Sequence, residues 1–239
     1  MIKTRIQKFI ALSGLCSRRK AEELIKEGKV KVNNKLVTIG DQCLPTDKIE
    51  VNGEIISFDP YDMVYIVMNK SSGYVTTNAD EFQRKTIYDF LKEKDKKTNL
   101  FSVGRLDKDT SGLLILTNDG KFAQSIIHPS QKITKEYIAQ TNKELRKDDQ
   151  RTLEKGIILD NYQLKPLKIR KISKNKYIIA ISEGRKRQIR RMFEQLNYNV
   201  ENLHRIQIGG LDLKELKLGF KEYSFVTKEF LKKKIFKKN

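Results

Sequence analysis

The stretch that decides the fold is residues 104–120, GRLDKDTSGLLILTNDG. Its apolar run, residues 113–116, has the length of a short buried strand. Two glycines bracket the polar turn before that strand, and an Asn-Asp-Gly triplet at 118–120 has the residue types that end a strand in a turn. The pattern fits an ordinary Asp-rich loop, but it also places Asp107 on a rigid support, which suits a catalytic carboxylate.

Other patterns of the same kind lie on both sides of this stretch. The expected strands are Met63–Met68, Tyr137–Ala139, Leu164–Ile169, Tyr177–Ile181 and Leu203–Ile208. A helix is expected from about Lys186 to Leu196, where apolar residues recur at helical spacing, and a short helix or turn at Ile87–Leu91. Strands interrupted by helices without regular alternation favour an α+β fold over a parallel, doubly wound sheet.

The residues up to about Phe58 form a pattern of their own. Two short helices are expected, one ending at Gly14 and one that begins after the N-cap candidate Ser17 and ends at Gly28. Short alternating strands follow, with tight turns at the two sites Asn33-Asn34 and Asn52-Gly53. Asp59, Pro60, Tyr61 and Asp62 have the composition of a linker. We therefore expect two domains, residues 1–60 and residues 61–239.

The charge balance points to a polyanionic partner. The 239 residues include 49 Lys and Arg against 30 Asp and Glu, a formal net charge of +19. Such a field attracts nucleic acid first and anionic membrane second, although part of the lysine excess can be solvated surface.

The sequence shows neither the pattern of a metal-binding protein nor that of a membrane protein. The two cysteines, Cys16 and Cys43, are isolated, and the chain has only two histidines, so the spacing of a Cys/His zinc site is missing. Apolar runs stay well short of membrane-spanning length, and the N-terminus lacks the apolar stretch of a secretory signal. We expect a soluble, cytoplasmic protein with reduced thiols and no metal.

The second predicted helix begins with three cations, although like charges oppose the positive end of a helix dipole there. This basic face suits phosphate groups, but charge alone fits a solvated surface equally well. Residues 5–10, Gly14, 17–22 and 28–33 resemble the alpha-L RNA-binding module of ribosomal protein S-four. The resemblance implies that this domain grips structured RNA through a basic helix pair. The RNA-binding candidates here are Arg5, Lys8, Arg18, Arg19 and Lys20.

The string 104–120 resembles the signature of the RsuA/RluB family of ribosomal RNA pseudouridine synthases. Further segments that match in family order are 65–77, 80–89, 128–129, 135–137, 183–192 and 203–210. One departure is Ser71, where the family usually has proline. The resemblance covers nearly the whole chain, and it implies a synthase domain with a mixed, largely antiparallel central sheet and a catalytic cleft across that sheet.

The resemblance also implies residue roles. Asp107 matches the catalytic aspartate, whose carboxylate can add to the base or assist at the sugar carbon; the sequence leaves both routes open. Tyr137 matches the residue expected to stack on the flipped base, Arg190 the cation expected to pair with Asp107, and Leu203 an apolar wall of the uracil pocket. Asp109 and Asp119 compete with Asp107 by residue type, and we interpret them as turn-forming groups.

The same family match implies the partners. RNA phosphates are the expected contacts of five arginines, Arg105, Arg185, Arg187, Arg191 and Arg205. The isomerisation is redox-neutral, so no metal or small-molecule cofactor is expected. The expected partner is ribosomal RNA or a pre-ribosomal particle. The sequence has no visible signature of an oligomer, so a monomer is the default expectation.

Three alternatives stay open. The residues 110–114 favour a large-subunit target, and a small-subunit uridine is the near alternative. A non-catalytic RNA-binding or ribosome-assembly protein could retain the synthase fold, although the acid, tyrosine and arginine positions are intact. An alpha-L domain joined to an enzyme of other RNA chemistry is weaker, because no methyl-donor glycine motif or metal cluster is present.

Overall fold

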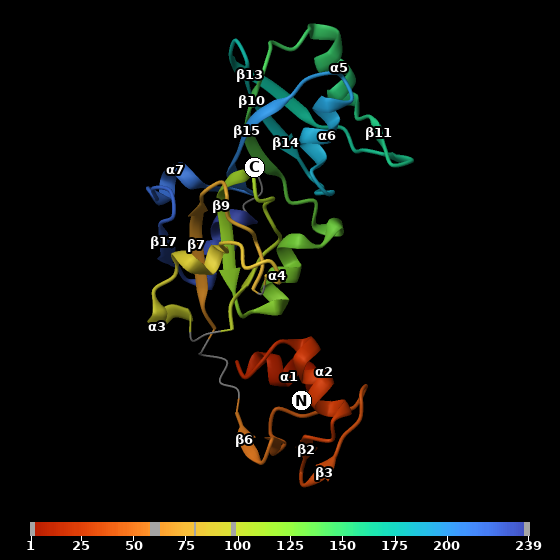
Figure 1. Ribbon diagram of the computed structural model, residues 1–239, viewed down its shortest axis with the longest axis vertical. Helices are drawn as coiled ribbons and strands as arrows, with labels where there is room; N and C mark the ends of the chain where they lie inside the picture. Colours follow the sequence, from red (N-terminus) through yellow and green to blue (C-terminus); the bar gives the residue numbers. More distant parts are fainter. Residues whose placement is uncertain (1–2, 58–62, 79, 97–98, 237–239) are drawn as a thin grey trace. The chain divides into compact units, whose positions relative to one another are not determined.

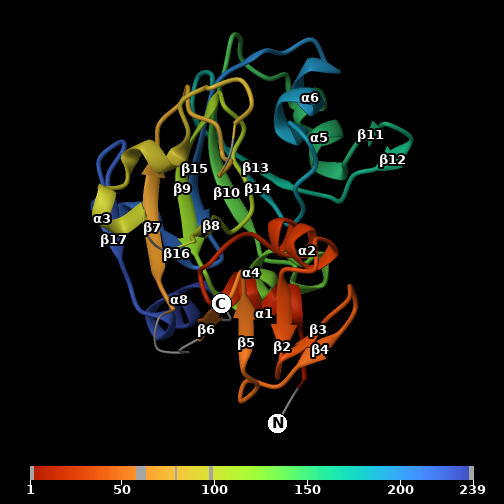
Figure 2. The same ribbon diagram turned by 60° about the horizontal axis from the view of Figure 1, so that its bottom comes forward.

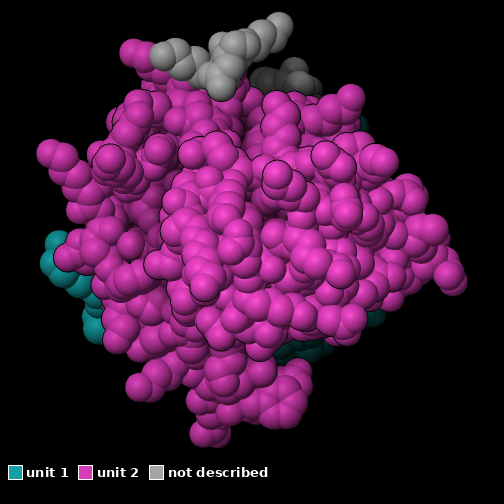
Figure 3. Space-filling model, turned by 90° about the horizontal axis from the view of Figure 1, so that it is seen from above, with its two compact units in different colours: residues 1–64, 92–101 teal, residues 65–91, 102–239 magenta. Residues whose placement is uncertain are grey.

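The computed structural model describes residues 3–57, 63–78, 80–96 and 99–236 (Figure 1). The chain divides into two compact units, residues 1–64 with 92–101 and residues 65–91 with 102–239 (Figure 3). The expected linker at residues 59–62 lies outside the described residues, so the boundary at residue 60 stays a prediction. Among the helices that the structure describes, none is long and apolar enough to cross a membrane.

The first unit begins with two short helices, α1 (Ile6–Leu12) and α2 (Arg18–Lys26). The expected cap is present, because the Ser17 side chain accepts a hydrogen bond from the backbone N–H of Lys20. The expected apolar faces are buried and meet in one core, which contains Ile6, Phe9, Ile10, Ala21, Leu24 and Ile25.

Short strands complete this unit. A four-stranded antiparallel sheet has the order β3 (Lys35–Leu36), β2 (Val30–Val32), β5 (Ile49–Val51), β6 (Glu54–Ile56), and β1 (Thr4–Arg5) pairs with β4 (Gln42–Cys43). Both expected hairpins form. Each turn has two consecutive residues at positive φ, Asn33 and Asn34 at 50° and 67°, and Asn52 and Gly53 at 52° and 85°. This is the backbone that a two-residue hairpin turn requires and that Asn and Gly tolerate best.

The second unit is built on one mixed sheet. Its strand order is β13 (Lys168–Ser173), β14 (Lys176–Ile181), β10 (Lys135–Thr141), β15 (Val200–Ile208), β9 (Thr110–Thr117), β7 (Tyr65–Lys70) and β17 (Tyr223–Phe225). Along this order every pair is antiparallel except β15 with β9, which is parallel. The expectation of an α+β fold with a mixed, largely antiparallel sheet is confirmed.

The remaining elements lie outside this strand order, and α3 (Glu93–Lys96) belongs to the first unit. The other strands are β8 (Phe101–Ser102), β16 (Leu211–Asp212) beside β15, and the separate hairpin of β11 (Ile158–Leu159) and β12 (Tyr162–Gln163). The helices are α3 (Glu93–Lys96), α4 (Gly120–Ile127), α5 (Lys147–Lys155), α6 (Gln188–Glu194), α7 (Leu213–Leu216), α8 (Lys228–Ile235) and the 3₁₀ turns η2 (Ile87–Phe90) and η3 (Pro129–Gln131). Helix α5 contacts β13 and α6 contacts β15 (Figure 1).

The parallel pair at the centre of the sheet allows an unusually close backbone approach. Figures 1 and 2 both show β9 between β7 and β15. Gly112 of β9 lies opposite Arg205 of β15 and has a φ of +112°. A Cβ atom at Gly112 would lie 2.2 Å from the carbonyl oxygen of Arg205. Only glycine fits this position, because the obstructing atoms are backbone.

Two expected elements are corrected. The expected strand at Leu164–Ile169 begins only at Lys168, because Pro166 cannot donate a ladder hydrogen bond and the residues before it are irregular. The expected helix at 186–196 is shorter, because Arg187 has a left-handed φ of 50° and the helix begins after it. The Asn-Asp-Gly triplet is more than a turn, because Asp119 caps α4 at its N-terminus.

We predict that Gly112→Ala lowers the free energy of unfolding by roughly 3 kcal/mol, because both the positive φ and the backbone of Arg205 oppose a methyl group. Thermal unfolding of the pure variant measures the loss. Gly184→Ala is the matched control, since Gly184 has no atom within 4 Å of an added Cβ. Equal unfolding temperatures for the two variants would contradict the role given to the close approach.

Candidate active site

The loop that carries Asp107 is fixed at several points of its backbone. The Thr76 hydroxyl donates to the carbonyl of Leu106 at 2.7 Å, and the Gly73 N–H donates to the carbonyl of Lys108 at 2.8 Å. The loop closes on itself through the N–H of Thr110, which donates to the carbonyl of Asp107 at 3.1 Å. Residues 106–110 are therefore held as a rigid turn at the start of β9.

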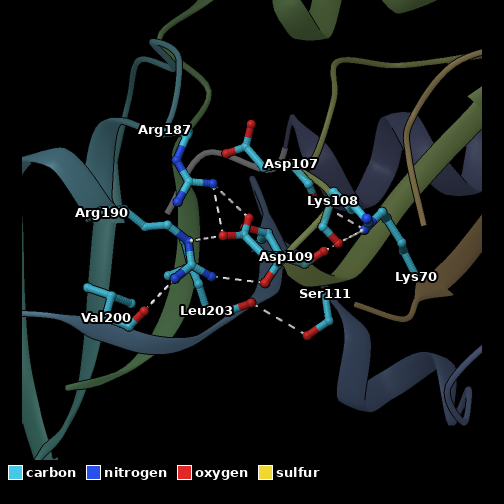
Figure 4. Close-up of polar contacts among 10 residues, drawn as sticks. Lys70, Asp107, Lys108, Asp109, Ser111, Arg187, Arg190, Val200 and Leu203 are labelled. Carbon is cyan, nitrogen blue, oxygen red and sulfur yellow. Dashed lines mark hydrogen bonds and ion pairs between the residues drawn. The ribbon is translucent and has the colours of Figure 1, made fainter. Parts of the chain in front are cut away.

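Lys70 provides the central contact to this loop. Its side chain is 0% exposed at the end of β7. The ammonium donates to four backbone carbonyls, those of Ser71, Asp107, Lys108 and Thr110, and the contact to Thr110 is shortest at 2.6 Å. Figure 4 shows the Lys70 side chain beside Lys108 of this loop. Burial lowers the pKa of Lys70 to about 8, although the negative charges of Asp109 and Asp107 oppose the shift.

Asp109 connects the loop to α6. Its carboxylate accepts two hydrogen bonds from Arg187 Nη1, at 3.0 and 2.8 Å, and forms an ion pair with Arg190 Nε at 3.2 Å. Burial alone would raise the pKa of Asp109, but these two arginines hold that pKa below its usual value. Asp109 is thus ionised and bound at neutral pH, and it does more than form a turn.

The expected pairing of Arg190 with Asp107 is corrected. Arg190 is only 6% exposed, and its Nη2 donates to the backbone carbonyl of Asp109 at 2.9 Å while Nη1 donates to that of Val200. The ion pair goes to Asp109 because that side chain is turned toward α6, whereas Asp107 points elsewhere (Figure 4). Arg190 touches the loop of Asp107 without touching its carboxylate.

The Asp107 carboxylate faces a cavity. Within the described ranges it accepts no hydrogen bond and forms no ion pair, and Figure 4 shows it directed away from Lys70. Asp107 lines a cavity of about 280 Å³ together with Tyr137 and Leu203. The structure therefore brings together three of the four expected catalytic positions around one space, while Arg190 is not among the residues that line it.

Strand register explains why these residues meet. Leu203 of β15 lies opposite Thr110 of β9, and Ala139 of β10 lies opposite Leu203 on its other side. Tyr137 is two residues from Ala139 on the same face of β10. Tyr137 and Leu203 are 8% and 6% exposed, so both offer mostly buried apolar surface beside the acid. The hydroxyl of Thr110 is buried at the same cavity without a hydrogen-bond partner among the described residues.

The expected RNA-binding residues fall into three groups. The exposed ones are Arg5, Arg18, Arg19 and Lys20 in the first unit and Arg105 and Arg185 in the second, while Lys8 is half-buried. Arg187 and Arg191 are already engaged in ion pairs, with Asp109 and with Asp160. Arg205 is 2% exposed and donates from Nε to the carbonyl of Leu113 at 2.7 Å. It lines a cavity instead of lying on the open surface, so its contact with an RNA phosphate stays a prediction.

Two residues of the site had been given no role. Lys70 belongs to a segment quoted for the resemblance, and its signal was a lysine that ends a strand of otherwise buried residues. Lys135 is a half-buried cation and the first residue of β10, two residues before Tyr137. For Lys70 the available signal was a charged residue in a strand buried on both sides; for Lys135 it was a cation at the start of a strand with one buried face.

The sequence of this chain is similar to those of known RNA-modifying proteins. The pattern of the RNA pseudouridylate synthase family matches residues 64–195, and the pattern of the S4 domain matches residues 4–49. The ribosomal large subunit pseudouridine synthase B of Bacillus subtilis is 43% identical over 222 residues, which are 90% of this chain and 89% of that protein.

Two further matches agree with this one. The dual-specificity RNA pseudouridine synthase RluF of Escherichia coli is 37% identical over 216 residues, covering 90% of this chain and 73% of the relative. A crystal structure of a pseudouridylate synthase superposes with a TM-score of 0.70 at 32% identity, covering 96% of this chain and 98% of that one.

We predict a pH-dependent stability that comes from Lys70. Its pKa of about 8 in the folded chain lies below the usual value of 10.5. Between these two pH values the unfolded chain binds the proton that the folded chain has lost, so the free energy of unfolding rises with pH. Denaturant unfolding measured from about pH 7.5 to 10.5 should show this rise as a difference between the wild type and Lys70→Met.

Lys108→Met is the matched control, because Lys108 belongs to the same loop and is exposed. Its pH profile should parallel that of the wild type. Parallel profiles for Lys70→Met and the wild type would instead mean that the four carbonyls keep the ammonium charged throughout this range.

Proposed function

The chain belongs to the RNA pseudouridylate synthase family and is an isomerase of that class, and on this premise we propose that it converts a uridine of large-subunit ribosomal RNA to pseudouridine. The observation that carries the proposal is the unpaired Asp107 carboxylate in a cavity walled by Tyr137 and Leu203. The large subunit is preferred because the relative with 43% identity is named for that subunit. A uridine of small-subunit RNA is the alternative target.

The target base must leave its stack before the carboxylate can reach it. Extrusion of a nucleotide costs roughly a few kcal/mol, which a pocket offsets by stacking and apolar contact. In our proposal the uracil stacks against Tyr137 and contacts Leu203, and Asp107 acts on the ribose–uracil linkage. The bond from the ribose to a ring nitrogen breaks, the base rotates, and a bond forms from the ribose to a ring carbon. That carbon loses its proton and the freed nitrogen gains one, so the reaction rearranges one nucleotide and consumes no second substrate.

We assign Arg190 as a positioning residue in this scheme. It holds both the carboxylate and the carbonyl of Asp109, two residues after the proposed catalytic acid. Arg187, the residue directly before α6, binds the same carboxylate. Because Asp109 takes up both arginines, Asp107 stays unpaired for the substrate.

The S4 domain gives the proposed enzyme its second RNA contact. The exposed cations at the start of α2, Arg18, Arg19 and Lys20, lie at a helix N-terminus, where backbone N–H groups also face outward. We propose that they bind RNA phosphates and place the target near Asp107. Our proposal includes ribosomal RNA or a pre-ribosomal particle as the partner, a monomeric enzyme and a cytoplasmic location.

We predict that Asp107→Asn abolishes pseudouridine formation and leaves RNA binding nearly unchanged, because the substitution removes the charge and keeps the shape. Carbodiimide mapping of ribosomal RNA from cells that lack the protein, complemented with either variant or the wild type, identifies the modified uridine. Asp148→Asn is the matched control, since that carboxylate is 90% exposed on α5.

A site restored by Asp107→Asn would overturn the assignment of the acid. A set of modified uridines identical with and without the protein would favour a non-catalytic role in ribosome assembly.

We also predict a steep salt dependence of RNA binding. The net charge of +19 implies that lysines and arginines displace counterions from phosphates. The logarithm of the affinity should fall linearly with the logarithm of the salt concentration, measured by filter binding or anisotropy with an rRNA fragment that holds the mapped site. An affinity that does not change with salt would contradict the role given to the basic surfaces.

A further inference from the structure

A second cavity lies next to the one that holds Asp107. Its volume is about 350 Å³, within the range of small-ligand pockets, and it belongs wholly to the second unit. Tyr137 lines both cavities, so the two spaces share one aromatic wall. The proposed isomerisation uses only the first of them.

The second cavity is strongly cationic. Its lining includes five cations, Arg105, Lys135, Lys165, Arg185 and Arg205. Arg105 and Arg185 also line the first cavity, and the other three line the second. The carboxylate in the lining is that of Glu183, and its Oε1 already accepts from the backbone N–H of Lys165 and from Gln188 Nε2, both at 3.0 Å. The charge of the cavity therefore calls for an anionic ligand.

Two of these cations, one buried and one half-buried, have incomplete hydrogen bonding. Arg205 is 2% exposed, and its Nη2 has no hydrogen-bond partner among the described residues. The hydrogen bond found for Lys135 Nζ goes to the carbonyl of Ile133 and is long, at 3.5 Å. Burial, and after it the charge of Arg205, lowers the pKa of Lys135. A buried and a half-buried cation side by side are costly unless an anion joins them.

The rim of the cavity presents a flat, stacked surface. The guanidinium of Arg185 lies 3.3 Å from the centre of the Tyr162 ring, and both residues are exposed. Tyr162 comes from the β11–β12 hairpin, outside the main sheet. Guanidinium planes and aromatic rings are the surfaces on which unpaired bases stack in RNA complexes.

We propose that this second cavity binds the nucleotide next to the isomerised uridine on the same RNA strand. Its phosphodiester contacts Lys135 and Arg205, and its base stacks on the pair of Arg185 and Tyr162. This inference rests on the proposed function and extends it, because it assigns residues that recognise the RNA around the target. Tyr137, as the shared wall, then separates the uridine from its neighbour.

The test couples a protein variant to a change in the RNA. Lys135→Met removes the charge and keeps the stem. Lys176→Met is the matched control, an exposed lysine at the opposite end of the β10–β14 ladder. Each protein is assayed in single turnover on an RNA that holds the mapped uridine, and on RNAs in which one flanking phosphate at a time is an uncharged methylphosphonate.

On the unmodified RNA, Lys135→Met should raise the half-saturating RNA concentration roughly tenfold, the size of one charged hydrogen bond, and Lys176→Met should not. At one flanking position the methylphosphonate should raise the half-saturating RNA concentration of the wild-type protein by a similar factor. The same methylphosphonate should cause no further rise in Lys135→Met. The proposal would be overturned if the effects of the methylphosphonate and of Lys135→Met on RNA binding were additive at every flanking phosphate. It would also be overturned if Lys135→Met bound the unmodified RNA as well as the wild type does.

A second variant guards against a folding defect in Lys135→Met. Tyr162→Leu alters only the exposed hairpin. It should raise the half-saturating concentration of the unmodified RNA, but not that of an RNA whose nucleotide next to the target uridine is abasic. Equal weakening on both RNAs would overturn the stacking role. If the wild type modifies no RNA at all, the proposed function fails, and that outcome is distinct from a failure of either coupling.

Discussion

The buried ammonium of Lys70 is the contact on which the site depends. Removing a lysine from water costs several kcal/mol, and here three backbone carbonyls of the Asp107 loop and that of Ser71 compensate the cost. Carbonyls that converge on one nitrogen force the side chains of the same residues to point outward. The orientation of Asp107 toward its cavity follows from this arrangement, whereas Asp109 is held toward α6 by Arg187 and Arg190. The acid is therefore placed by backbone contacts, and its carboxylate remains unpaired.

Much of the fold could be predicted where local chemistry leaves one solution. The turn at Asn52-Gly53 needs two residues at positive φ, and the sequence supplies the two residue types that tolerate it. Helix α5 (Lys147–Lys155) was missed because Leu153 is its only apolar residue and gives no periodic stripe. The strand expected at 164–169 failed for a related reason, since Leu164 and Leu167 are buried in an irregular segment around a proline. Burial alone does not define a strand.

The site was predictable in its residues more than in its contacts. Asp107, Tyr137 and Leu203 were named from a family resemblance, since none of them stands out by spacing alone. The partner of Arg190 could not be read from sequence, because two aspartates two residues apart face opposite sides of a turn and only the three-dimensional loop decides which one meets α6. Arg205 was expected to contact RNA phosphates, and its position in a central strand places its side chain in the lining of a cavity instead of on the open surface.

The parallel pairing of β9 with β15 also has a consequence for the order of assembly. Thr110 is adjacent to Leu203 in the sheet although more than ninety residues separate them along the chain. A ribosome that synthesises this protein releases the acid-bearing loop long before the strand that walls its cavity. Pairings between distant segments form slowly, because the intervening chain must first be closed into a loop. A nascent chain can thus hold RNA through its early-made first unit while its reaction centre is still unfinished.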